Sequence, residues 1–307
     1  MQVVELFELD VPAVQALVAR AERADGVAPL GEAFLRGLDD ASFGHRHFGA
    51  FEADSLVGLA ALAPDAMELV VDPPHRRTAV ASALLAFVDA EVGQRLPGWA
   101  HGDIAGGARL AELTGRTVVR ELLQMTISGE ALTQAAHSVA QREDVEAVTL
   151  TSACARWGTD AVDQAWLRVN NEAFHWHPEQ GGWEIEQLRR ARNTQWFDPE
   201  GVFFAADMAA PDDSAEQIVG FHWTKWHQGM EPATGEVYVI GLAGAAQGRG
   251  LGQWLTAVGL RHLVERGAQQ VLLYVEGDNK PAIATYRKLG FETSQRDLMY
   301  GVDGETG

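Results

Sequence analysis

The chain has 307 residues, of which 47% are hydrophobic, and a formal net charge of -19 at pH 7. This length suits one large domain or two of ordinary size, and the hydrophobic content is typical of a folded protein. The negative charge argues against nucleic acid and anionic membrane surfaces as partners, because both would be repelled. We therefore expect neither.

The apolar segments are too short to cross a bilayer. Stretches such as AVASALLAFV at 79–88 fall well below the roughly 20 residues that a spanning helix needs. The N-terminus, MQVVELFELD, carries acidic residues where a secretion signal would carry basic ones. We expect a cytoplasmic protein, and its single cysteine, Cys154, excludes an internal disulfide.

The first half of the chain predicts strands followed by a turn and two helices. DSLVGLAAL (54–62) has the alternation of a strand, and an apolar segment then leads through VVDPPHRRTAVASALL (70–85) into a helix. HGDIAGGARLAELTG (101–115) predicts a second helix that ends at a glycine. A polar, helix-biased connector follows at 128–150.

The second half repeats this pattern. EQIVGFHWT (216–224) corresponds to the first strand, GLAGAAQGRGLGQWLT (241–256) to the turn and helix, and EGDNKPAIATYRKLG (276–290) to the second helix. The chain thus predicts two tandem modules, residues 1–140 and 146–307. Each is expected to be an α/β module with a mixed, mostly antiparallel sheet flanked by helices.

The two copies differ where a ligand would bind. Gly250 and Gly252 of the second copy correspond to Ala79 and Ala81 of the first, and Tyr286 corresponds to Ala111. Asn279 corresponds to Ile104. Because the polar and conformationally permissive residues occur only in the second copy, we expect catalysis there.

The glycine cluster QGRGLG (247–252) stands between an apolar run and a helical pattern. Glycines at a helix start let several backbone N–H groups converge on an anion such as pyrophosphate. The cluster lacks the Gly-Lys-Ser/Thr of a phosphate loop and the spacing of the dinucleotide fingerprint. A plain tight turn remains an alternative interpretation.

Taken together with VLLYVEGDN and AIATYRKLGF, the cluster resembles the acyl-CoA-binding core of the GCN5-related N-acetyltransferases. The resemblance implies acetyl-CoA as acetyl donor and a strand that parts from its neighbour, freeing backbone groups for pantetheine. The implied cofactor-binding residues are Ile240, Gly241, Leu242, Gln247, Gly248, Arg249, Gly250, Leu251, Gly252, Gln253, Asn279 and Ala282.

Two residues have the properties that acetyl transfer requires. An α-amino group has a pKa of about 8, so a carboxylate such as Glu236 can serve as its general base. The leaving thiolate needs a nearby acid, and the phenol of Tyr286, placed near the sulfur by the resemblance, can be that acid. The alternatives are an exposed strand-end acid at Glu236 and a packing aromatic at Tyr286.

A narrower resemblance spans nearly the whole chain. DGVAPLGE (25–32), HPEQGGW (177–183), WFDPEG (196–201), GEVYVIG (235–241) and LLYVEGDN (272–279), on two tandem modules, are similar to the mycothiol synthases of actinobacteria. That family acetylates the cysteinyl amine of a cysteine-glucosamine-inositol conjugate, which is the last step of mycothiol synthesis. The resemblance implies contacts to this small-molecule substrate from Glu32, Glu179, Lys225, Glu236 and Tyr274.

The resemblance implies no metal, and His175 and His177 lack an acidic or cysteine partner that would suggest one. In the first module, Leu69, Val70, Val71 and the Arg76 to Ala81 turn are expected to hold an acyl-CoA without using it. We expect a monomer. Two alternatives stay open: an acetyltransferase for another amine, and a non-catalytic acyl-CoA-binding protein.

Overall fold

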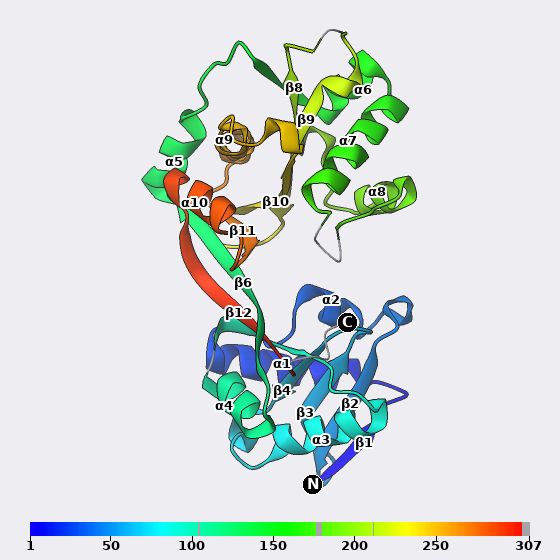
Figure 1. Cartoon of the computed structure of the whole chain (residues 1–307). Coiled ribbons are helices and arrows are strands. Elements are labelled where there is room, and N and C mark those ends of the chain that lie inside the picture. Colours follow the sequence, from blue (N-terminus) through cyan, green and yellow to red (C-terminus); the bar gives the residue numbers. More distant parts are fainter. Residues whose placement is uncertain (104, 176–179, 211, 303–307) are drawn as a thin grey trace. The chain divides into compact units, whose positions relative to one another are not determined.

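The computed structural model describes residues 1–103, 105–175, 180–210 and 212–302. These residues form two compact units (Figure 1). Unit 1 comprises Met1–Leu123, Glu276–Asp278 and the segment that starts at Gln295, and unit 2 comprises Gln124–Val275 and Asn279–Ser294. The division of the chain at 140–146 rests on sequence repetition rather than on contacts, and it stays a prediction.

Unit 1 contains a mixed sheet with strand order β1-β2-β3-β4-β5-β12. Neighbouring strands are antiparallel except for the parallel pair β4 and β5. The strands are β1 (Gln2–Glu5), β2 (Arg46–Glu52), β3 (Ser55–Leu62), β4 (Met67–Val71), β5 (Gly98–Ala100) and β12 (Glu292–Gly301). Both β12 and β6 (Thr117–Ser128) contribute residues to the two units. The helices are α1 (Val11–Asp25), α2 (Glu32–Arg36), α3 (Val80–Val92) and α4 (Ala105–Thr114).

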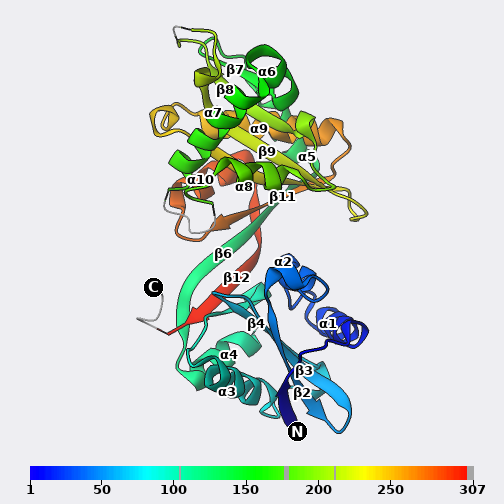
Figure 2. The same ribbon diagram turned by 90° about the vertical axis from the view of Figure 1, so that its right-hand side faces the viewer.

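Helices cover both faces of the unit 1 sheet because most of β3 is apolar. Leu59 and Ala61 pack in one cluster with Leu17 of α1. Ala60 and Leu62 pack in a second cluster with α3. Successive strand residues point to opposite faces, so one apolar strand supplies both layers. Figure 2 shows α1 and α3 on either side of these strands.

Unit 2 repeats the arrangement with strand order β11-β10-β9-β8-β7. Only the pair β10 and β11 is parallel among these strands. The strands are β7 (Val145–Thr149), β8 (Val202–Asp207), β9 (Ile218–His227), β10 (Thr234–Leu242) and β11 (Gln270–Glu276). The helices are α5 (Gly129–His137), α6 (Leu150–Trp157), α7 (Thr159–Ala173), α8 (Ile185–Arg192), α9 (Leu251–Glu265) and α10 (Lys280–Leu289).

The main core of unit 2 lies between the sheet and α7. Val162, Trp166 and Val169 recur at helical spacing and are almost fully buried. The Trp166 ring lies 5.4 Å from that of Trp223 on β9, centroid to centroid. A separate cluster joins Leu255 of α9 to the sheet.

The same strand-turn-helix segment occurs in both units, as the sequence repeat predicts. A short 3₁₀ helix follows β4 at Pro73–His75 and β10 at Gly244–Ala246, and a long helix then begins at Val80 or Leu251. Each following strand leads to a helix that ends at a left-handed glycine, Gly115 or Gly290. The predicted fold class, two tandem α/β modules of this kind, is confirmed.

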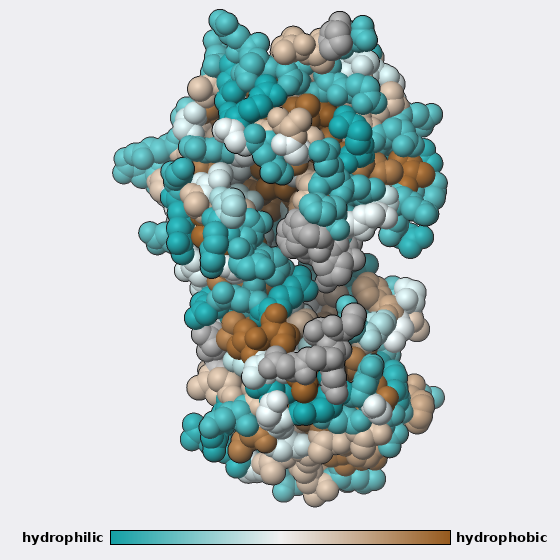
Figure 3. Space-filling view, viewed as in Figure 1, coloured by the Kyte–Doolittle hydropathy of each residue, from teal (hydrophilic) through white to brown (hydrophobic). Residues whose placement is uncertain are grey.

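On the face drawn in Figure 3, hydrophilic residues cover much of unit 2, and unit 1 shows hydrophilic and hydrophobic residues side by side. No helix in the described part of the chain has the length and apolar character needed to span a membrane.

Candidate active site

The strand β10 parts from its parallel neighbour inside unit 2. The ladder between β10 and β11 pairs Thr234 with Gln270 and ends where Val237 pairs with Leu273. Farther along, Ile240, Gly241 and Leu242 have ladder partners on β9 only, among the described residues. The register of β10 against β9 also shifts between Val237 and Val239, which is a β-bulge. The backbone of the predicted pantetheine site thus has no ladder partner on β11 among the described residues.

Glu236 lies just before this parting, on the third residue of β10. The residue is 6% exposed, so it is not the solvated strand-end acid of the alternative interpretation. Its Oε2 atom lies 2.7 Å from Nε2 of His227, at the end of β9. Burial next to a hydrogen-bonding partner is the environment in which catalytic carboxylates occur.

Lys225 is the direct cross-strand partner of Glu236. Opposite residues of an antiparallel pair share one face of the sheet, so both side chains leave the sheet toward the same side. The Lys225 Nζ atom lies 5.1 Å from the centroid of the Trp196 ring and 5.5 Å from that of Tyr238. The two rings are themselves in edge contact at 4.8 Å. A cation held over aromatic faces is restricted in its orientation.

Tyr274 and Glu236 also share a sheet face. Glu236 pairs with Leu272 on β11, and Tyr274 follows two residues later, which returns the side chain to the same face. The Tyr274 residue is 46% exposed, and its hydroxyl accepts a hydrogen bond from Nε2 of Gln124 at 2.9 Å. Unit 2 therefore brings together three of the predicted acceptor-binding residues.

The two remaining acceptor-binding predictions lie elsewhere. Glu32 is exposed on the first residue of α2 in unit 1. Glu179 lies outside the described residues. Their contacts with the acceptor stay predictions.

Tyr286 is buried on α10, with 7% of its surface exposed. Its ring lies 5.8 Å from that of Phe291, centroid to centroid, in an edge contact. Burial raises the pKa of the phenol to about 12, because the charged phenolate would lose its hydration. The group therefore carries its proton at neutral pH.

The glycine turn adopts the conformation that glycine permits most readily. Gly248 and Gly250 have φ angles of 75° and 76°, in the left-handed region, and Gly250 is the N-cap of α9. No side chain caps this helix start among the described residues, and its first turn has no acidic side chain. The N–H groups of Leu251, Gly252 and Gln253 therefore have no acceptor within the helix. Such N–H groups at a helix start are suited to bind an anion.

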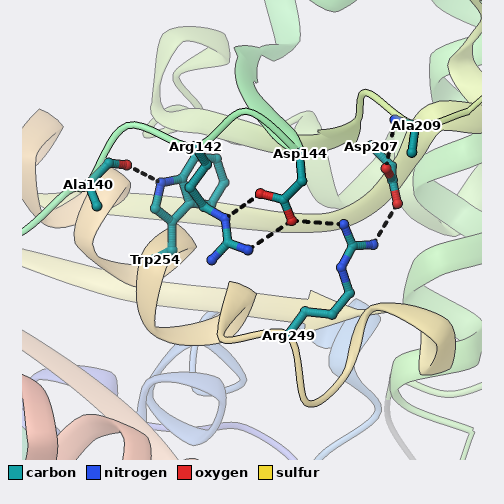
Figure 4. Close-up of polar contacts among 7 residues, drawn as sticks. All are labelled: Ala140, Arg142, Asp144, Asp207, Ala209, Arg249 and Trp254. Carbon is teal, nitrogen blue, oxygen red and sulfur yellow. Dashed lines mark hydrogen bonds and ion pairs between the residues drawn. The ribbon is translucent and has the colours of Figure 1, made fainter.

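Arg249 has a different environment from its neighbours in the turn. Its Nη1 atom donates to Oδ2 of Asp207 at 2.5 Å, and its Nη2 atom donates to Oδ2 of Asp144 at 3.1 Å (Figure 4). Arg142 binds the same Asp144 carboxylate through Nε and Nη2. The side chain of Arg249 thus ties the turn to the end of β8 and to the residue that precedes β7.

Asn279 caps α10 in the structure. Its Oδ1 atom accepts a hydrogen bond from the N–H group of Ala282 at 3.2 Å. This contact occupies one oxygen lone pair and leaves the amide NH₂ group of the side chain as a donor. A role beside the cofactor, predicted for both residues, is compatible with the cap.

The first module keeps the geometry of the second without its glycines. The parallel ladder between β4 and β5 ends at Glu68, and Leu69, Val70 and Val71 pair with β3 only, among the described residues. A cavity of about 950 Å³ is lined by these three residues and by much of the following turn. It lies within unit 1, whereas Glu236 lies in unit 2.

Sequence reasoning missed the residues that surround the predicted ones. His227 stands two positions after Lys225, and strand alternation would have placed it on the same face as Glu236. Trp196 follows from no local pattern, because it lies in the loop between α8 and β8. Tyr238 lies two positions after Glu236 on β10, the strand that pairs with the one carrying Lys225. In the described part of the chain, no group of three or more His, Cys, Asp and Glu side chains has the geometry of a metal site.

Comparison with known proteins agrees with the fold. A family model described as Acetyltransferase (GNAT) family matches residues 166–291. Among solved structures, a GCN5-related N-acetyltransferase from Sphaerobacter thermophilus has a TM-score of 0.71 at 20% identity over 97% of this chain and 94% of its own. A tandem GNAT protein from the clavulanic acid biosynthesis pathway has a TM-score of 0.68 at 18% identity over 97% of both chains. These two show the fold.

Curated relatives are closer in sequence. The mycothiol acetyltransferase of Corynebacterium aurimucosum is 45% identical over 94% of this chain and 93% of its own length. That of Corynebacterium urealyticum is 43% identical over 94% of both. Identity at this level over nearly the whole length shows that the chain belongs to the mycothiol acetyltransferase family.

Proposed function

We propose that this chain transfers the acetyl group of acetyl-CoA to the cysteinyl amine of a cysteine-glucosamine-inositol conjugate, which completes mycothiol. Family membership supports the reaction class. The observation that carries the proposal is the buried Glu236 carboxylate beside Lys225, placed just before β10 parts from β11.

Glu236 is the proposed general base. The acceptor amine is largely an ammonium ion at neutral pH, since α-amino groups have a pKa of about 8. Glu236 accepts one N–H proton, either directly or through water, and the freed nitrogen lone pair forms a C–N bond with the thioester carbonyl carbon. The acetyl group passes directly to nitrogen, without a covalent intermediate on the enzyme.

The donor is positioned by backbone rather than by charged side chains. Ile240, Gly241 and Leu242 offer strand N–H and C=O groups to pantetheine, and the amides from Gly248 to Gln253 receive pyrophosphate. The bulge between Val237 and Val239 redirects backbone groups next to Glu236. An N–H group aimed at the thioester oxygen would stabilise the negative charge that develops there.

Tyr286 is the proposed general acid. When the C–S bond breaks, the thiolate of CoA takes the phenolic proton. Burial raises the pKa of the phenol, and a thiolate that leaves into the same apolar surroundings has its pKa raised for the same reason. Proton transfer between the two groups therefore remains feasible.

The acceptor is recognised through hydrogen bonds from several elements. Lys225 and Tyr274 donate to hydroxyl or carbonyl oxygens of the sugar conjugate, and Glu32 and Glu179 accept from its hydroxyls. The exposed fraction of Tyr274 and the aromatic contacts of Lys225 support this assignment in unit 2.

We also propose that the first module holds an acyl-CoA without turning it over. The cavity of about 950 Å³ beside Leu69, Val70 and Val71 supports binding. The absence of a tyrosine at Ala111, which is itself buried, supports the lack of turnover. Calorimetric titration with CoA should then detect two sites per chain. If the wild type bound CoA at one site only, and Gly250→Asp abolished that binding, this second proposal would be contradicted.

The main proposal is tested by an acceptor panel. Purified protein is given acetyl-CoA with the cysteinyl conjugate, glucosamine, a polyamine or an aminoglycoside, and release of CoA thiol is followed. We expect turnover with the conjugate at a rate far above the others. Protein that binds acetyl-CoA but shows no turnover with the conjugate would contradict the proposal, and equal rates with another amine would change the acceptor.

A further inference from the structure

His227 and Glu236 are joined by a short contact whose chemistry requires a proton. Nε2 of His227 lies 2.7 Å from Oε2 of Glu236. An imidazole lone pair and a carboxylate lone pair would repel each other at that distance, so one proton lies between them. With Glu236 ionised, His227 must therefore present Nε2–H as the donor.

The contact leaves the two carboxylate oxygens of Glu236 unequal. Oε2 accepts from His227, while Oε1 accepts no hydrogen bond from the described residues. The carboxylate would otherwise rotate about its last side-chain bond, where the torsional preference is broad. The imidazole thus fixes the plane of the carboxylate and leaves Oε1 as the oxygen without a hydrogen-bond donor among the described residues.

The fold accounts for this arrangement. His227 is opposite Thr234 in the ladder between β9 and β10, and Glu236 is opposite Lys225. The histidine and the glutamate are therefore diagonal neighbours on one sheet face, within reach of long side chains. The side chain of His227 is 22% exposed and that of Glu236 only 8%, so the histidine is the more accessible member of the pair.

We infer that His227 is a positioning residue for acetyl transfer, which acts by holding the Glu236 carboxylate in the orientation that accepts the proton of the amine. This inference rests on the proposed function, in which Glu236 is the base. It assigns to His227 no contact with either substrate. Loss of His227 should consequently lower kcat and leave the KM for acetyl-CoA unchanged.

A double-mutant cycle tests the inference, with His227→Ala, Glu236→Gln and the double variant compared for kcat, KM and CoA binding. We expect His227→Ala to lower kcat by about tenfold, the effect of losing one hydrogen bond to a charged group. In the Glu236→Gln background the same change should have no further effect, because there is no carboxylate left to orient.

Two conservative variants provide a matched control. The side-chain amide of glutamine reaches the position of Nε2, whereas that of asparagine reaches only the position of Nδ1. His227→Gln should therefore recover most of the lost kcat, and His227→Asn should behave like the alanine variant. Because both replacements are small polar amides, a purely structural role for His227 would not separate them.

The results distinguish failure of the inference from failure of the proposed function. If Glu236→Gln is slow and His227→Ala works at the wild-type rate, the role of His227 is overturned, while the role of Glu236 as the base still stands. Additive losses in the double variant would also overturn it. A Glu236→Gln variant of wild-type rate would show that Glu236 is not the base, and the inference would fall with the proposed mechanism.

Discussion

Ala79 in the first module and Gly250 in the second hold the same left-handed backbone conformation, with φ angles of 67° and 76°. Each is the N-cap of the long helix that follows the turn, α3 or α9. Two positions earlier, Arg77 has a φ of 64° and Gly248 a φ of 75°. The turn has therefore kept its shape in a copy that has lost both glycines.

Keeping that shape without glycine costs stability, which leads to a first prediction. A residue with a Cβ atom in the left-handed region is strained by roughly 1–2 kcal/mol. Ala79→Gly should relieve this strain, in part offset by the greater entropy of glycine in the unfolded chain. We expect the free energy of unfolding to rise by about 0.5–1 kcal/mol, measured by urea denaturation. A loss of stability would contradict the strain at Ala79.

The reverse change in the second module should affect both stability and ligand binding. The Cβ atom of Gly250→Ala would meet no atom closer than 3.9 Å, so the backbone conformation alone opposes it. We expect about 1 kcal/mol of destabilisation and a higher KM for acetyl-CoA. Gly252→Ala is the matched control, because Gly252 has no positive φ and its new Cβ atom would lie 3.6 Å from Leu242. An equal rise of KM in both variants would contradict this account.

Much of the fold could be predicted because its signals are local. The repeat, the alternation of the strands and the glycines that end the second helix of each module, Gly115 and Gly290, were enough to predict both modules. The parting of β10 from β11 came only with the family resemblance. The left-handed Ala79 was not predictable, because tertiary packing rather than its own preference sets its conformation.

The side-chain partners within the site were also beyond the sequence. The contact between His227 and Glu236 depends on the register of a hairpin whose connection spans 228–233. The tie from Arg249 to Asp207 joins segments 42 positions apart. Neither contact produces a periodic pattern of residues from which it could be predicted.

The ion pairs of Arg249 should matter for cofactor binding rather than for chemistry. Arg249→Ala removes the tie between the turn and the carboxylates of Asp207 and Asp144. We expect the KM for acetyl-CoA to rise about fivefold, equivalent to about 1 kcal/mol, with kcat nearly unchanged. Initial rates at varied acetyl-CoA concentration measure both quantities.

Arg266→Ala is the control for that experiment. Arg266 makes a comparable ion pair with Asp198, at 2.7 Å, in the same unit but away from the glycine turn. Its removal should leave the KM for acetyl-CoA as it is in the wild type. If Arg249→Ala also left the KM unchanged, the ion pairs would have no part in shaping the turn.

Unit 1 should lose stability at alkaline pH through His101. Burial alone would lower the pKa of this imidazole, but hydrogen bonds with Asp297 and Glu68 outweigh burial and raise the pKa to about 9. The stabilisation of the folded state by protonated His101 is therefore fully present below a pH of about 6.5, the pKa of an unperturbed histidine. This stabilisation is lost as the pH rises through about 9. We expect His101→Gln to destabilise the protein by roughly 2–3 kcal/mol at pH 7.

Calorimetric unfolding at pH 7 and pH 10 checks that expectation by difference. The difference in the free energy of unfolding between the wild type and His101→Gln should be smaller at pH 10 than at pH 7. Other groups that titrate in both proteins cancel in this difference. His137→Gln serves as a control, because His137 is exposed on α5 and should leave the stability unchanged at either pH. A constant difference would mean that His101 is not charged at neutral pH.

The central claim is that the second module carries the chemistry through the Glu236 carboxylate, and one comparison tests it most directly. Asp65 precedes the turn of the first module at the spacing that Glu236 has in the second, and it is exposed. The kcat for acetylation of the cysteinyl conjugate is measured for Glu236→Gln and for Asp65→Asn, with CoA binding verified in both. We predict a loss of at least about a hundredfold for Glu236→Gln and a wild-type rate for Asp65→Asn. A Glu236→Gln enzyme that works at the wild-type rate would contradict the account.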